Sequence, residues 1–457
     1  MKYKDKVPVP KSHFKELPKV TVQLPIFNEM YVASRLVDAI TKLDYPKDLL
    51  EIQVLDDSTD ETQNILSKLV QDYKKQGFDI QYLHRTDRTG FKAGALAEGL
   101  KVAKGNFVAI FDADFVPNPE MLKQSIHFFT DEKVGMIQTR WGHINRDYSL
   151  LTKIQAVMLD GHFVVEQTAR NRSGSFFNFN GTAGIWRKKA ILESGGWQHD
   201  TLTEDLDLSY RAQLDGWDFI FLPHIVTPAE LPVDMNAFKS QQHRWAKGSI
   251  QTMKKLLPKI LGSKLPFKVK FEAFFHLTNN IAYLLMSIPS FLVIPVIVSN
   301  KHLSDNLTLS TIGYFLFFFF ATFSVSMYYL VSQKYAYNDW KDRIKLLPLL
   351  MGIGIGLSIN NSKAVLEALF NHATDFIRTP KYGDISKSSK RISKKYITRK
   401  NFSLFLELGL AFYFTTSLFY LFWETKDYVS IPFLLLFQFG FLYVSMASFL
   451  PGILKRT

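Results

Sequence analysis

The chain has 457 residues, a formal net charge of +13 and no cysteine. Its length predicts two or three domains, and the lack of cysteine excludes disulfides and thiolate metal sites. Nucleic-acid binding is not expected, because no basic stretch interleaved with aromatic residues stands out before residue 260. Near that residue the composition changes from mixed charged and apolar residues to long apolar runs with almost no charge.

Residues 1–18 form a basic, polar tail without an apolar stretch that could serve as a signal peptide. We therefore expect the domain that follows, residues 19–258, to lie in the cytoplasm. From residue 19 predicted strands alternate with predicted helices, which indicates an α/β fold with a mostly parallel sheet. The predicted strands are 19–25, 51–55, 80–83, 107–111 and 134–141; helices are predicted at 28–39, from 60, from about 90, up to about 168, from 204 and at 235–257.

Two aspartates follow the central predicted strand. The apolar run 107–111 does not alternate, as in strands buried on both faces, and Asp112 and Asp114 come directly after it. In open α/β sheets, ligands bind beyond the carboxyl ends of such strands. Carboxylates spaced i and i+2 can meet on one hard divalent cation, Mg²⁺ or Mn²⁺, which would hold a diphosphate. A solvated turn is the alternative interpretation of this pair.

Two further stretches indicate contact with another group. Lys92 lies at the predicted start of a helix, where it could meet a phosphate or remain a solvated cation. Residues 176–184 read Phe-Phe-Asn-Phe-Asn-Gly-Thr-Ala-Gly and suit neither a helix nor a strand. They are predicted to form a loop whose backbone comes close to either the protein core or a ligand.

The helix predicted from Glu204 carries a candidate catalytic base. Thr203 can cap this helix, and acids in its first turn, such as Asp205 and Asp207, are favourable at the positive end of the helix dipole. If the start of the helix faces the cleft that holds Asp112, a carboxylate there could instead accept a proton from an alcohol.

Three residues of the helix predicted at 235–257 share one face. Gln241, Arg244 and Trp245 are spaced i, i+3 and i+4. They offer an amide, a guanidinium that can bind phosphate and a flat ring on which a sugar can stack. A lone tryptophan is more often part of a core, so the prediction that Trp245 binds a sugar depends on the other motifs.

The motifs form an ordered set. Asp-Asp-Ser at 56–58, Asp-x-Asp at 112–114, Thr-Glu-Asp at 203–205 and Gln-x-x-Arg-Trp at 241–245 are followed by apolar segments. In this the chain resembles the processive family-2 glycosyltransferases, which include the cellulose synthases. The stretches 179–187 and 241–245 are most similar to the cellulose-synthase-like glucomannan 4-beta-mannosyltransferases. The resemblance covers residues 19 to about 400.

The resemblance implies a GT-A (Rossmann-like) fold for residues 19–258 and a metal-dependent, inverting sugar transfer. It implies that Asp205 is the general base and that Asp112 and Asp114 bind Mg²⁺ or Mn²⁺. The residues implied to bind the nucleotide-sugar are Asn28, Glu29, Asp56, Asp57, Lys92, Asp112, Gln241 and Arg244. Those implied to lie near the acceptor are Phe179, Gly181, Thr182 and Trp245.

Residues 259–457 are predicted to form a multi-pass membrane domain. The segments 279–299, 307–332, 402–423 and 428–454 are long and apolar enough to span a bilayer as helices. The segment 346–370 is apolar only in its first half and is predicted to be re-entrant or interfacial. The basic segments 334–345 and 378–400 favour the cytoplasmic side of the membrane.

Residues 376–381, Phe-Ile-Arg-Thr-Pro-Lys, are similar to the gating-loop motif Phe-x-Val-Thr-x-Lys of cellulose synthases. The similarity implies that Phe376, Thr379 and Lys381 belong to a gating loop at about 376–400 that responds to the nucleotide. Arg378 stands where the motif has valine. A charged linker is the alternative interpretation.

Together these patterns predict a membrane-bound inverting hexosyltransferase that adds a sugar from a nucleotide-sugar to a growing β-glycan. The alternative is a β-glycosyltransferase whose acceptor is a lipid, either ceramide or diacylglycerol, reached through the membrane helices. A catalytically inactive membrane protein is disfavoured, because every expected acidic position is filled. The sequence leaves the donor open between GDP-mannose and UDP-glucose.

Overall fold

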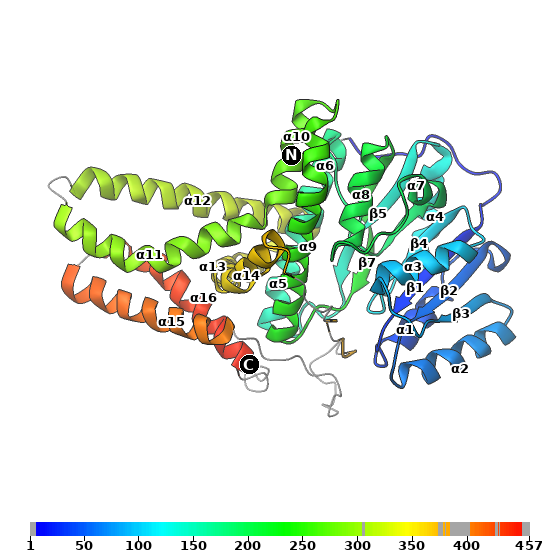
Figure 1. The fold of residues 1–457 in the computed structure, drawn as a ribbon, viewed down its shortest axis with the longest axis horizontal. Coiled ribbons are helices and arrows are strands. Elements are labelled where there is room, and N and C mark those ends of the chain that lie inside the picture. Colours follow the sequence, from blue (N-terminus) through cyan, green and yellow to red (C-terminus); the bar gives the residue numbers. More distant parts are fainter. Residues whose placement is uncertain are drawn as a thin grey trace.

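The computed structural model describes residues 6–303, 307–372, 378–379, 381–383, 403–425, 428 and 430–449. Within these residues a seven-stranded sheet flanked by helices is followed by long helices that extend away from it (Figure 1). The sheet contains β1 (Val20–Ile26), β2 (Leu50–Asp56), β3 (Asp79–His84), β4 (Phe107–Ile110), β5 (Val134–His143), β6 (Gly184–Arg187) and β7 (Asp218–Ala229).

The strand order is β3-β2-β1-β4-β6-β5-β7. β6 pairs antiparallel with β4 and β5, whereas the other neighbouring strands pair parallel. The sheet is therefore mostly parallel, as predicted. The chain builds outward from β1 to β3 and then returns to place β4 on the other side of β1. This reversal of strand order is the point at which open α/β sheets bind ligands.

Helices cover both faces of the sheet. The helical segments up to residue 262 are α1 (Ala33–Ile40), η1 (Lys47–Leu49), α2 (Thr62–Lys75), α3 (Phe91–Val102), α4 (Met121–Ile126), η2 (His127–Thr130), α5 (Leu150–Asp160), the π-helical η3 (Gly161–Gln167), α6 (Thr168–Ser173), α7 (Lys188–Glu193), α8 (Glu204–Leu214) and α9 (Met235–Gly262). β4 shows how the two faces are packed: Phe107 and Ala109 enter one core with α1, and Val108 and Ile110 enter the other with α3. Side chains of a strand alternate between faces, so a strand buried on both sides must be apolar throughout.

Several predicted boundaries need correction. α1 begins at Ala33 instead of residue 28, because Asn28 has a positive φ of 52° that no α-helix accommodates. α2 begins at Thr62, whose N–H donates to Asp60 Oδ1. The helix predicted to end near 168 is divided into α5, η3 and α6. The prediction also missed the four-residue β6 and the longer β7. In β7, Pro223 breaks the strand pattern; a proline is tolerated there because β7 is an edge strand.

The remaining helices form the second part of the structure (Figure 1). They are α10 (Phe267–Thr278), α11 (Ile281–Leu303), α12 (Leu307–Ala336), η4 (Trp340–Leu346), α13 (Leu347–Gly356), α14 (Ser358–Leu369), α15 (Ser403–Tyr420), the π-helical η5 (Leu421–Thr425) and α16 (Ile431–Phe449). On α15, Phe405, Phe412 and Phe419 recur every two turns and are 70%, 71% and 63% exposed. Such a row of exposed phenylalanines is suited to lipid rather than water.

Among the described residues, two helices are long and apolar enough to cross a membrane, Ser403–Glu424 and Ile431–Phe449. The number rises to four if each of two bent pairs forms one span. These pairs are Phe267–Thr278 with Ile281–Val296, bent by 54°, and Trp340–Gly356 with Ser358–Leu369, bent by 42°. The second bend suits a broken span and a re-entrant segment equally. The re-entrant segment and the number of crossings therefore stay predictions.

Candidate active site

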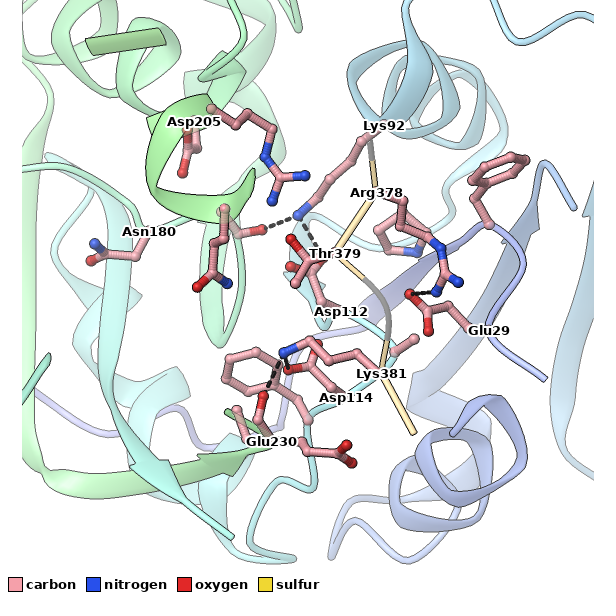
Figure 2. Close-up of a pocket in the computed structure, with 18 of the residues that line it drawn as sticks. Glu29, Lys92, Asp112, Asp114, Asn180, Asp205, Glu230, Arg378, Thr379 and Lys381 are labelled. Atoms are coloured by element: carbon pink, nitrogen blue, oxygen red, sulfur yellow. Dashed lines mark hydrogen bonds and ion pairs between the residues drawn. The ribbon is translucent and has the colours of Figure 1, made fainter. Parts of the chain in front are cut away.

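One cavity lies beyond the carboxyl ends of β1 and β4, where the strand order reverses. The starts of α3, α8 and the middle of α9 contribute to its wall, together with residues 378, 379 and 381 (Figure 2). Its polar and charged lining residues are Glu29, Asp57, Arg88, Lys92, Asp112, Asp114, His143, Asn180, Thr203, Glu204, Asp205, Glu230, Gln241, Arg244, Arg378, Thr379 and Lys381. Most of the residues singled out from separate sequence motifs are thus brought together in one place.

Asp112 is held by groups from two other segments. Lys92 Nζ lies 2.5 Å from Asp112 Oδ1 and donates to the carbonyl oxygen of Gly181 at 2.8 Å. The backbone N–H of Asp112 donates to Thr182 Oγ1 at 2.8 Å. Burial raises the pKa of Asp112 although Lys92 opposes this effect, and the charges of Asp112 and Glu204 outweigh burial to raise the pKa of Lys92. Lys92 is therefore a fixed positive charge in the cavity.

Asp114 is paired with a lysine from far along the chain. Lys381 Nζ lies 2.7 Å from Asp114 Oδ2 and also donates to the backbone carbonyl oxygen of Glu230 (Figure 2). The Glu230 carboxylate accepts hydrogen bonds from the backbone N–H groups of Tyr382 and Gly383, at 3.0 and 3.1 Å. Glu230, directly after β7, thereby anchors residues 381–383 at the cavity.

A second ion pair fixes the other end of this loop. Arg378 lies 2.7 Å from Glu29, which follows β1 (Figure 2). Burial raises the pKa of Glu29 to about 8, even though Arg378 acts in the opposite direction. Burial thus opposes the ionisation of Glu29, and Arg378 offsets part of this cost.

Asp205 lies in the first turn of α8, and its carboxylate accepts a hydrogen bond from the Leu206 N–H at 2.8 Å. Burial and the neighbouring Glu204 raise the pKa of Asp205 to about 7. Gly181 makes room for this carboxylate: its φ is +81°, and a Cβ there would lie 3.0 Å from Asp205 Oδ2. Thr203 does not cap α8 with its side chain, contrary to prediction; its hydroxyl lies 3.2 Å from that of Thr252 on α9.

α9 presents Gln241, Arg244 and Trp245 to the cavity as the helical spacing predicted. The helix starts at Met235 because the side chain of Asp234 accepts hydrogen bonds from the first free N–H groups. Burial lowers the pKa of Arg244, although the carboxylates of the cavity oppose this effect. An arginine remains charged under such a shift, so Arg244 adds a second, partly buried cation to Lys92.

Four residues predicted for the site do not line the cavity. Asp56 is fully buried and accepts from the Tyr82 hydroxyl at 2.6 Å, because consecutive residues of a strand face opposite ways and only Asp57 faces the cavity. Asn28 instead accepts a hydrogen bond from the Thr59 N–H, Phe179 packs edge-on against Trp186 in the core, and Thr182 holds the backbone of Asp112. Phe376, predicted for the gating loop, lies outside the described residues.

The sequence patterns did not single out several residues of the cavity. Glu230 was missed together with β7, and Arg88, which stacks 3.3 Å from the centre of the Phe27 ring, lies in an irregular turn. Asn180 was only part of the predicted loop 176–184. The two glycines of that loop were the available signal, because they indicated that its backbone approaches another group closely.

The residues present suit a metal that is shared with a ligand. Among the described residues, no group of three or more histidine, aspartate or glutamate side chains could hold a metal ion. Asp112 and Asp114 each lie beside an ammonium group, at 2.5 and 2.7 Å, so both accept positive charge inside the cavity. Two carboxylates fit Mg²⁺ or Mn²⁺ when a diphosphate and water supply the other oxygen ligands.

This fold and cavity are those of a GT-A glycosyltransferase, and the comparison with known families agrees. Residues 18–248, slightly more than half of the chain, match the family described as "Glycosyltransferase like family 2". The chain belongs to this family.

The chain is also similar to Glucomannan 4-beta-mannosyltransferase 2 of Arabidopsis thaliana, with 45% identity over 259 residues that cover 56% of this chain and 48% of that protein. Identity to Glucomannan 4-beta-mannosyltransferase 1 of Oryza sativa subsp. japonica is 42% over 252 residues, or 54% of this chain and 48% of that protein. The chain thus spans about half the length of these relatives. The predicted resemblance is confirmed.

A solved structure supports the fold. The mannosyltransferase PcManGT from Pyrobaculum calidifontis, in complex with GDP-Man and Mn²⁺, superimposes with a TM-score of 0.54 over 80% of this chain and 90% of that one. The sequence identity is 19%, so the likeness concerns the fold alone. It confirms the predicted GT-A architecture.

Proposed function

We propose that this protein is a membrane-bound inverting hexosyltransferase that extends a β-glycan from a nucleotide-sugar. The observation that carries the proposal is that a carboxylate with a pKa near 7, Asp205, shares one cavity with the Asp112 and Asp114 pair, Arg244 and Trp245. A base, a diphosphate site and a flat acceptor surface are the parts that such a transfer needs. The names of the relatives favour mannose, so GDP-mannose is the first donor to test and UDP-glucose the second.

The donor would bind over β1 and β4, with its nucleoside near Glu29 and Asp57 and its diphosphate near Lys92, Gln241 and Arg244. A divalent cation, Mg²⁺ or Mn²⁺, would be held by Asp112 and Asp114 and would stabilise the charge of the departing diphosphate. Lys92 and Arg244 would act in the same direction, because both are partly buried cations that line the cavity.

Asp205 would accept the proton of the incoming hydroxyl. A pKa near 7 lets the carboxylate ionise at neutral pH and still take up a proton readily as the new bond forms. The attack of one hydroxyl on the face opposite the diphosphate inverts the anomeric carbon, so an α-linked donor would give a β-linked product. No second nucleophile is needed.

The acceptor sugar would stack on Trp245, beside the loop 176–184. An indole ring contacts the apolar face of a pyranose with little directional demand, which lets each new sugar take the place of the last. Trp245 follows Arg244 directly on α9, so one rigid helix would align the acceptor with the donor.

For the whole chain we propose a catalytic part at about 19–258 on the cytoplasmic side and a multi-pass membrane part at about 259–457. The apolar helices α15 and α16 support membrane association. The loop that contains Thr379 and Lys381 would gate the donor site, because Lys381 pairs with Asp114 of the proposed metal pair.

The test is to incubate membranes containing the protein with labelled GDP-mannose or UDP-glucose and to size the product. A long chain that a β-endoglycanase degrades supports the proposal. A labelled lipid carrying one sugar, extracted into organic solvent, would replace it with the lipid glycosyltransferase. Trp245→Ala should nearly abolish elongation and leave donor binding unchanged, whereas Trp423→Ala, at an exposed ring on η5, should elongate normally.

A further inference from the structure

The amide of Asn180 is held from two sides by residues of η3. Asn180 lines the cavity from the loop before β6 and lies on the opposite side of it from Glu29 (Figure 2). Gln167 Nε2 donates to Asn180 Oδ1 at 2.6 Å, and Asn180 Nδ2 lies 2.9 Å from His162 Nε2. Neither His162 nor Gln167 lines the cavity itself.

The contacts determine which atom of each group donates. Gln167 Nε2 also lies 2.9 Å from the backbone carbonyl oxygen of Asn178, which can only accept a hydrogen bond. The NH₂ group of Gln167 must therefore donate to Asn180, and the side-chain oxygen of Asn180 must accept this hydrogen bond. The NH₂ group of Asn180 then faces His162, so His162 Nε2 carries no proton and its Nδ1 donates to Glu166 Oε2 at 3.0 Å. One N–H of Asn180 remains without a partner among these residues.

The π-helical form of η3 makes this arrangement possible. His162 and Gln167 are five residues apart, and in an α-helix they would point about 140° away from each other. A π-helix winds more slowly, with hydrogen bonds from i to i+5, so both side chains turn toward Asn180. Short π-helical segments often occur at functional sites.

Residues of α6 and α12 hold Glu166, the hydrogen-bond partner of His162. Glu166 accepts from the Tyr328 hydroxyl of α12 at 2.9 Å and from Arg170 at 3.2 Å. Gly161 allows α12 to approach this closely, because a Cβ there would lie 2.7 Å from the Tyr328 ring. The imidazole is thus fixed through contacts that reach from the cavity to a helix of the second part of the structure.

We propose that His162 is a positioning residue: it orients the Asn180 amide so that the remaining N–H of Asn180 donates to a hydroxyl of the acceptor sugar. This inference rests on the proposed function, since it needs an acceptor in the cavity. Asn180 would then help to select and align the acceptor, and His162 would act only through Asn180.

The experiment measures KM for a β-linked oligosaccharide acceptor, KM for the donor and kcat in the full-length protein. His162→Leu should raise the acceptor KM about tenfold, as for one lost hydrogen bond, with donor KM and kcat within about twofold. His162→Gln should stay close to the wild type, because its Oε1 can accept from Asn180. His224→Leu, at an exposed position of β7, is the matched control and should have no effect.

A double-mutant cycle decides whether the effect passes through Asn180. Asn180→Ala should raise the acceptor KM as His162→Leu does, and the double variant should be no worse than Asn180→Ala. Additive effects, or an unchanged acceptor KM in His162→Leu, would overturn the inference while leaving the proposed function intact. If the wild type transfers sugar to no oligosaccharide, the proposed function fails and the inference fails with it.

Discussion

At the scale of single residues, the cavity holds carboxylates in two different states. Asp112 and Asp114 are each paired with a lysine, whereas Asp205 accepts a hydrogen bond from a backbone N–H and lies beside a second acid, Glu204. A paired carboxylate is ready to exchange its ammonium partner for another cation. A carboxylate beside a second acid is instead ready to take up a proton.

Asp205→Asn tests the base. As the base, its loss should lower turnover by a factor of about 10² or more with donor affinity unchanged. The pKa of Asp205 is raised in the folded protein, so ionising it costs stability as pH rises from about 4, the pKa of the unfolded chain, through about 7. Asp205→Asn should therefore unfold at a higher temperature than the wild type at pH 8.

In the wild type, kcat/KM should rise with pH through about 7, since the base must be ionised. Turnover, donor affinity and melting temperature measured together give the answer. Nearly normal turnover with a stability loss of about 1 kcal/mol or less would mean that Asp205 serves only the helix dipole.

Asp114→Asn tests the metal pair. It should weaken donor binding and lower transfer by about 10² or more, because an amide is a poorer ligand for a hard cation than a carboxylate. EDTA should inactivate the wild type, and added Mn²⁺ should restore it. Asp44→Asn, at an exposed surface pair, serves as the control. Full activity of the wild type in EDTA would contradict a metal-dependent transfer.

At the scale of elements, a loop containing residues 378, 379 and 381–383 brings a cation from the far end of the chain to the proposed metal pair. Glu29, after β1, holds this loop through Arg378. Glu230, directly after β7, holds it through the backbone N–H groups of Tyr382 and Gly383. The ammonium group of Lys381 thus lies beside Asp114, where a bound metal ion would otherwise supply the positive charge. The metal ion that arrives with the donor and the ammonium group of Lys381 would therefore compete for the carboxylate of Asp114.

Lys381→Met tests this competition. Without donor, the variant should bind Mn²⁺ roughly tenfold more tightly, because removing a positive charge this close removes on the order of 1 kcal/mol or more of repulsion. Free Mn²⁺ measured by electron paramagnetic resonance gives the affinity. Lys123→Met is the control, since Lys123 pairs with Asp44 at 2.7 Å outside the cavity. Equal Mn²⁺ affinity in Lys381→Met and the wild type would rule the competition out.

At the scale of the whole molecule, α9 joins the two parts of the structure. It carries Arg244 and Trp245 toward the cavity, and its Lys239 pairs with Glu407 of α15 at 2.6 Å. Both side chains are buried, at 2% and 0% exposed. Lys247, further along α9, pairs with Glu367 of α14 at 3.2 Å. The helix that holds the proposed donor and acceptor is thus anchored by charge to the apolar helices.

Glu407→Ala should lower the free energy of unfolding by about 3 kcal/mol or more, because it leaves the ammonium of Lys239 buried without a counter-charge. The double variant Lys239→Met/Glu407→Leu should recover most of this loss. Thermal unfolding of the purified protein in detergent provides the measurement. Glu98→Ala, which breaks an exposed pair with Lys101, should cost well under 1 kcal/mol. Equal losses in Glu407→Ala and Glu98→Ala would show that the buried pair contributes nothing.

The sequence by itself determined the features that depend on local patterns. The apolar run before Asp112 predicted a strand buried on both faces, and the spacing of Gln241, Arg244 and Trp245 predicted their common face. Five strands were predicted to within two residues at each end, since strand burial leaves a pattern in neighbouring residues. β7 was hidden by its prolines, which only an edge position permits.

Only the tertiary structure decided which of these residues meet. Asp56 and Asp57 are adjacent in sequence, yet only Asp57 reaches the cavity. Lys381 and Asp114 are 267 positions apart and still form an ion pair, and Asn180 is oriented by His162 from a π-helical segment with no recognised sequence signal. Contacts of this kind depend on chain reversals and on packing between distant elements. They leave no periodicity in the local sequence, so only the folded chain reveals them.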